Sequence, residues 1–142
     1  MIKRLTIKNF KCLRDIDISL GNFNVLIGPN DTGKTSFLDA LLMLSKISTT
    51  NVLGQCFQDS WSLEKIKWIG SPEPEIQFGL QYKDLEYSLD VTTVAGKPVV
   101  KNESLRNSEN TLLQIQTKGT APSHEYKIAY KGQVINTIPK TN

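Results

Sequence analysis

The sequence predicts an α/β fold in which a strand–loop–helix unit is followed by an antiparallel β region. An apolar run at 23–27 precedes a glycine-containing loop at 28–35 and a helical pattern at 36–47. Beyond residue 75, short alternating segments separated by turns are typical of β-hairpins. At 142 residues, with 39% hydrophobic and 22% charged residues, the chain has the size and composition of one globular domain.

Two strands are predicted ahead of the loop. Residues 2–10 alternate between apolar and polar side chains, which indicates a strand with one buried face. A short turn at 13–15 leads to a half-exposed strand at 15–20, which Gly21 and Asn22 end. The side chains of the first strand that we expect in the core are Leu5, Ile7 and Phe10.

The apolar run and the helix after it are both expected to be buried. Residues 23–27 are apolar apart from Asn24, as in a central strand that is covered on both faces. The helix at 36–47 has a broad apolar face and should pack largely against the sheet. Its apolar side chains are Phe37, Leu38, Leu41, Leu42 and Leu44, with Ala40 and Met43 between them.

The loop between this strand and helix fits the phosphate-binding pattern G-x-x-x-x-G-K-[ST] at every fixed position. Its two glycines allow backbone N–H groups to surround an anion, and the helix N-terminus adds positive potential there. Lys34 would reach the β- and γ-phosphates, and the Thr35 hydroxyl would bind Mg²⁺. A purely structural glycine turn is the alternative. The predicted nucleotide-binding residues of this segment are Gly28, Asn30, Asp31, Thr32, Gly33, Lys34, Thr35 and Ser36.

The segment after the helix carries mixed signals. Weak helix formers at 48–51 end the helix, and Ser60 is expected to cap a short helix that reaches Lys67. Trp61 and Trp68 would share one face of that helix and serve in packing.

The second half is predicted to form antiparallel strands after a break at Gly70–Pro74. We expect two-residue turns at 83–84 and 131–132, and a loop or short helix at 101–110. The expected strands are 75–82, 85–94, 112–117, 124–130 and 133–138. The predicted organisation is a nucleotide-binding lobe at 1–50, a connecting segment at 51–74 and an antiparallel β subdomain at 75–142.

Composition excludes several function classes. A net charge of +3 does not by itself predict nucleic-acid binding, and no apolar run approaches the roughly 18–20 residues that span a membrane. The N-terminus is unlike a signal peptide, so we expect a cytoplasmic protein. Cys12 and Cys56 lack metal-site spacing and are expected to be buried thiols. His124 is expected on a strand surface, without a metal site or a catalytic triad. The early basic residues, expected on a solvated strand face, are Lys3, Arg4, Lys8, Lys11 and Arg14.

Two stretches resemble a known family. These are Ile7-Lys8-Asn9-Phe10-Lys11-Cys12-Leu13 and the segment from Val25 to Leu41 that contains the loop. Together they resemble the N-terminal lobe of SMC-like P-loop ATPases, in particular the RecF/OLD-like AAA ATPases of DNA repair and anti-phage defence. The resemblance covers roughly residues 2–45. Residues 99–105 also resemble a strand that is common in that family.

The resemblance implies ATP and Mg²⁺ as ligands and gives several residues a role. Asn30 matches a loop asparagine that approaches the γ-phosphate or the attacking water. Lys11 matches a basic residue that reaches back to the phosphates, and a solvated strand-end lysine is the alternative. Phe10 is favoured as a core anchor over an adenine-stacking ring. Asp31 places a carboxylate near the phosphates, directed to solvent.

The sequence also departs from the family pattern. No apolar strand ending in Asp-Glu, the Walker B motif, is present, and residues 80–86 are its nearest equivalent. No signature motif or histidine switch is found, so no catalytic residue is assigned and enzymatic activity of this chain alone stays open. The Mg²⁺-contacting glutamine is not resolved among Gln55, Gln58, Gln77 and Gln81.

The resemblance therefore predicts the N-terminal portion of an incomplete ABC/SMC-type ATPase head. Such a portion would bind ATP–Mg²⁺, and hydrolysis would occur only in a full-length or complemented protein. The alternative is a subunit of a split ATPase, a docking module to which a partner chain supplies Walker B; a small-molecule P-loop kinase is a third, less favoured reading. A head-to-head homodimer and DNA binding follow from the family alone. We also expect an exposed apolar surface where the second lobe docks.

Overall fold

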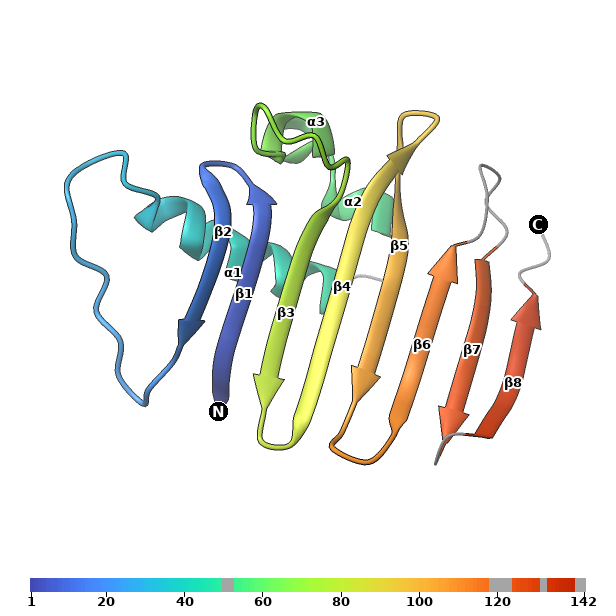
Figure 1. The fold of residues 1–142 in the computed structure, drawn as a ribbon. Helices are drawn as coiled ribbons and strands as arrows, with labels where there is room; N and C mark the ends of the chain where they lie inside the picture. Colours follow the sequence, from blue (N-terminus) through green and yellow to red (C-terminus); the bar gives the residue numbers. More distant parts are fainter. Residues whose placement is uncertain (50–52, 118–123, 131–132, 140–142) are drawn as a thin grey trace.

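The computed structural model describes residues 1–49, 53–117, 124–130 and 133–139, and it describes the side chains up to residue 115. The chain forms one eight-stranded sheet with helices on one face (Figure 1). The strand order is β2-β1-β3-β4-β5-β6-β7-β8, and neighbouring strands run antiparallel. The elements are β1 (Ile2–Phe10), β2 (Leu13–Ser19), α1 (Lys34–Thr49), α2 (Leu53–Cys56), η1 (Asp59–Trp61), α3 (Leu63–Ile66), β3 (Ile76–Tyr82), β4 (Leu85–Val94), β5 (Lys97–Arg106), β6 (Thr111–Thr117), β7 (His124–Tyr130) and β8 (Gln133–Pro139).

The α/β class predicted from the sequence is confirmed. The loop-and-helix unit lies beside an antiparallel sheet, and β1 pairs with both β2 and β3, so the N-terminal hairpin and the later strands share one sheet. The division at residues 50 and 74 stays a prediction. Within the described residues, no helix is long and apolar enough to cross a membrane.

The core lies between the sheet and α1, which passes behind β1 and β3 in Figure 1. We call this side of the sheet the inner face and the opposite side the outer face. Along the inner face, Ile7 pairs with Phe78, which in turn pairs with Leu89. Leu5, Ile7 and Phe10 are fully buried, as the alternation in β1 predicted.

The first hairpin turns earlier than predicted. Its turn is at Lys11 and Cys12 rather than at 13–15, and β2 already begins at Leu13. Leu13 is buried and pairs with Phe10, so an apolar contact across the hairpin sets the register.

The prediction of a loop or short helix at 101–110 was wrong for 101–106, which belong to β5; residues 107–110 form the loop before β6. Its polar residues find polar partners on β4. Asn102 Nδ2 donates to Asp90 Oδ2 at 2.9 Å, and the hydroxyls of Ser104 and Ser88 lie 2.7 Å apart. Cross-strand polar pairs of this kind stabilise a strand that hydrophobic alternation does not reveal.

The predicted central strand at 23–27 is absent from the described structure. Phe23 is 86% exposed and Ile27 is 90% exposed, on an extended segment that lies beyond β2 (Figure 1). A central strand needs partners on its edges, and within the described residues no strand pairs with this segment. Apolar composition alone therefore does not produce a strand here.

The helical region also differs in detail from the prediction. In α1 the buried side chains are Phe37, Ala40 and Met43, whereas Leu38 and Leu42 are exposed. The helix contacts the sheet on one side only, so the outward half of its apolar face is left uncovered.

The two tryptophans do not share a helix face, because the expected helix to Lys67 is broken into η1 and α3. Neither short helix has a side-chain cap, so Ser60 does not act as predicted. Trp61 lies in η1, and Trp68 follows α3 and stacks under Arg14 at 5.3 Å. Trp61 packs against the core, in keeping with its predicted packing role.

Predictions for the remaining residues had mixed outcomes. Cys56 is buried, but Cys12 is exposed because the hairpin turn carries it outward. Arg4 and Lys8 pair with acids of β2 across the hairpin and are solvated, as expected of a strand face. The turn at 131–132 and the side chain of His124 lie outside the described residues.

The half-buried Tyr87 predicts a weakening of the fold at alkaline pH. Burial, and then the hydrogen bond from its hydroxyl to Glu103 Oε1 at 2.8 Å, raise the pKa of Tyr87 above its ordinary value. Below about pH 10 the phenol is protonated in both states; above it, the unfolded tyrosine ionises first and stability falls. Between about pH 9 and about pH 11, the free energy of unfolding in urea should fall less for Tyr87→Phe than for the unsubstituted chain. Tyr82→Phe, at an exposed position, is the control; equal slopes for both variants would contradict the assignment.

Candidate functional site

The phosphate-binding pattern lies in a loop that ends directly on α1. Phe37 N–H donates to the Gly33 carbonyl at 2.8 Å, which closes the first helical turn. The N–H groups of the first turn have no acceptor within the helix and, with the helix dipole, favour an anion. Asp31 has φ +62° and Gly33 φ +93°, the left-handed conformations that turn successive N–H groups toward one point.

A cavity of about 490 Å³ opens at this helix terminus. Six of the residues predicted from the sequence line it, together with one that was not predicted. They are Asn30, Asp31, Gly33, Lys34, Thr35, Ser36 and the additional Cys12. Gly28 and Thr32 instead line a neighbouring, mainly apolar cavity of about 400 Å³. The structure therefore gathers most of the predicted set around one space.

Lys34 spans the loop. Its Nζ donates to the carbonyl of Gly28 at 2.7 Å and to that of Pro29 at 2.5 Å. Thr32 Oγ1 donates to the same Pro29 carbonyl at 2.9 Å. A Cβ on Gly28 would lie 2.9 Å from this Thr32 oxygen, so the closed loop requires glycine at that position. The ammonium is thus bonded to two loop carbonyls, and Lys34 lines both the loop cavity and the neighbouring apolar cavity.

Lys11 lies beside α1 and does not line the cavity. Its Nζ pairs with Asp39 Oδ2 at 2.6 Å and lies 4.5 Å from the centre of the Trp61 ring. Lys46 stacks on the same ring, also at 4.5 Å. The phosphate contact that the resemblance implies for Lys11 stays a prediction. Phe10 is fully buried against Phe78, which fits a core anchor.

Cys12 is the cavity residue that sequence reasoning did not select. Its Sγ donates to Ser36 Oγ at 3.2 Å, from the turn between β1 and β2 to the first turn of α1. The one feature of the sequence that could have pointed to Cys12 is its position directly after Lys11, in the stretch at 7–13 that resembles the family. Only the folded hairpin brings this position next to a loop some twenty residues later in the sequence.

An apolar surface adjoins the site. It comprises six exposed side chains on the extended segment and on α1: Phe23, Val25, Leu26, Ile27, Leu38 and Leu42. A cavity of about 590 Å³ lies among several of these residues and the edge of β2. The exposed apolar surface expected from the sequence is therefore present next to the loop.

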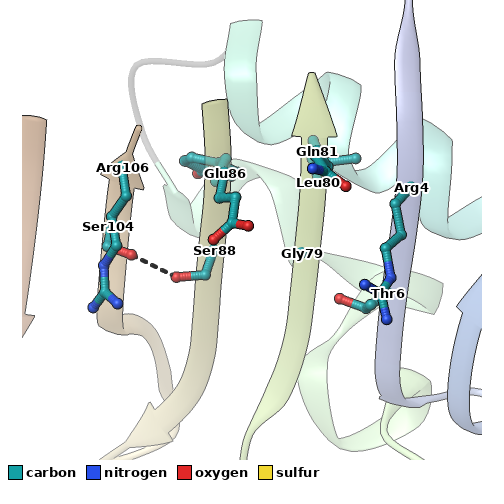
Figure 2. A pocket seen from close by; sticks show the side chains of 10 residues that line it. Arg4, Thr6, Gly79, Leu80, Gln81, Glu86, Ser88, Ser104 and Arg106 are labelled. Atoms are coloured by element: carbon teal, nitrogen blue, oxygen red, sulfur yellow. Dashed lines mark hydrogen bonds between the residues drawn. The ribbon is translucent and has the colours of Figure 1, made fainter. Parts of the chain in front are cut away.

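A fourth cavity, of about 300 Å³, lies on the outer face of the sheet (Figure 2). Thr6 covers Gly79 on its floor, where an added Cβ would lie 2.3 Å from the threonine hydroxyl. Arg4 at its rim is held by both carboxylate oxygens of Asp17, and the floor serines bond to each other. Arg4, Ser88 and Ser104 are thus paired within the protein, and this cavity contains no nucleotide-binding motif, so the loop cavity is the stronger candidate site. No metal-binding cluster of His, Cys, Asp or Glu occurs among the described residues.

Comparisons with known proteins agree with this assignment. A family model described as an AAA ATPase domain matches residues 1–141. The OLD nuclease of Thermus scotoductus is 54% identical over 41 residues, 29% of this chain and 8% of that protein. Endonuclease GajA of Bacillus cereus is 52% identical over 40 residues, 28% of this chain and 7% of that protein. The DNA replication and repair protein RecF of Vibrio campbellii is 51% identical over 45 residues, 30% of this chain and 12% of that protein.

These matches confirm the RecF/OLD-like resemblance read from the sequence, and the chain corresponds to a small part of the length of each relative. A solved chain from work on ATP-driven dimerization and DNA-stimulated activation of SMC ATPases aligns over 78% of this chain and 70% of its own. Its sequence identity is 15% and its TM-score is 0.47. Because the family model covers nearly the whole sequence, the chain belongs to the AAA ATPase domain family.

Proposed function

We propose that the chain is the ATP-binding portion of a RecF/OLD-like ATPase that serves DNA repair or anti-phage defence. The observation that carries the proposal is the cavity at the N-terminus of α1, which is lined by six of the predicted nucleotide-binding residues, Lys34 and Thr35 among them. The triphosphate would lie along residues 30–36, with the Thr35 hydroxyl on Mg²⁺. DNA binding and a head-to-head homodimer enter this proposal through the family names alone.

Hydrolysis, in this proposal, needs groups from beyond this sequence. Among the described residues, Asp31 is the one carboxylate that lines the cavity, and it is exposed on the loop. Residues 80–86, the nearest sequence to Walker B, comprise the end of β3, the turn at 83–84 and the start of β4, and none of them lines the loop cavity. The chain by itself is therefore proposed to bind ATP–Mg²⁺ without efficient turnover.

Calorimetric titration with ATP tests the binding proposal. We expect one site whose affinity rises when Mg²⁺ is added, because the metal bridges phosphate oxygens and the Thr35 hydroxyl. Thr35→Ala should lose this metal dependence, whereas Thr35→Ser, which keeps the hydroxyl, should retain it. An ATP affinity that is the same with Mg²⁺ and with a chelator would contradict the assigned role of Thr35. Absence of binding would reject the proposal itself.

The apolar surface supports a docking role, which the split-subunit alternative shares. Its side chains lie next to the loop, and such a surface is rare on a monomer. We propose that the remainder of the ATPase head covers it, either as further chain or as a partner subunit. Light scattering should show the isolated chain associating, and Leu38→Lys should reduce this association. Glu64→Lys, at an exposed position outside this surface, is the control. A chain that stays monomeric at high concentration would argue against docking there.

A further inference from the structure

We draw no further inference here: the strongest candidate, the cavity of about 300 Å³ on the outer face of the sheet across β1, β3, β4 and β5, carries nothing, because Arg4, Ser88 and Ser104 are paired within the protein and nothing in the structure shows what would occupy it.

Discussion

Replacing Lys34 with alanine is expected to weaken ATP–Mg²⁺ binding by about 10- to 100-fold. A hydrogen bond to a charged group contributes about 1.5–3 kcal/mol, and about 1.4 kcal/mol corresponds to a factor of ten in affinity. Lys34 also ties together the loop through the Gly28 and Pro29 carbonyls, so its loss should loosen the nest as well. Isothermal titration of both proteins at the same salt concentration measures the difference.

The control for this experiment is Lys97→Ala, which removes the same charge from an exposed position at the start of β5. It should bind ATP as the unsubstituted chain does. If Lys97→Ala and Lys34→Ala lose affinity equally, general electrostatic attraction would account for binding, and the loop would not be the site. Lys34→Arg should recover little of the lost ATP affinity, because the larger, planar guanidinium cannot take the place of the compact ammonium in the loop.

Replacing Phe10 with alanine is expected to lower the free energy of unfolding by about 3–5 kcal/mol. The ring is fully buried, and its centroid lies 5.8 Å from that of Phe78 in a tilted arrangement. Its loss leaves a cavity between β1 and β3 and removes the anchor between Asn9 and Lys11, so ATP affinity should fall with it. Urea denaturation gives the stability change.

Phe23→Ala is the matched control, since Phe23 is 86% exposed on the extended segment. The same truncation there should change stability by less than about 0.5 kcal/mol. A loss as large as that of Phe10→Ala would mean that the segment at 23–27 is packed in solution, as the sequence pattern predicts for a strand. The pair of variants therefore reports on the one large disagreement between the sequence pattern and the structure.

Local sequence patterns were sufficient for much of this protein. The loop at 28–35 could be recognised because its chemistry depends on a few residue types at fixed spacing along the chain. The alternation in β1 identified its buried residues, and the turn at 83–84 placed the β3–β4 hairpin correctly. In each case neighbouring residues provide the interactions that determine the structure.

Long-range contacts decided the rest. The segment at 23–27 has strand composition but lacks strand partners among the described residues, and β5 forms despite its polar composition because β4 supplies partners for Asn102 and Ser104. Cys12 enters the candidate site only because the hairpin turn packs on Gly33. The sequence by itself thus determined the loop pattern from which phosphate binding is proposed, and the core strands, because both depend on local spacing. Tertiary structure decided the position of Cys12 beside the loop and which apolar side chains are exposed, because both depend on contacts between segments distant in the chain.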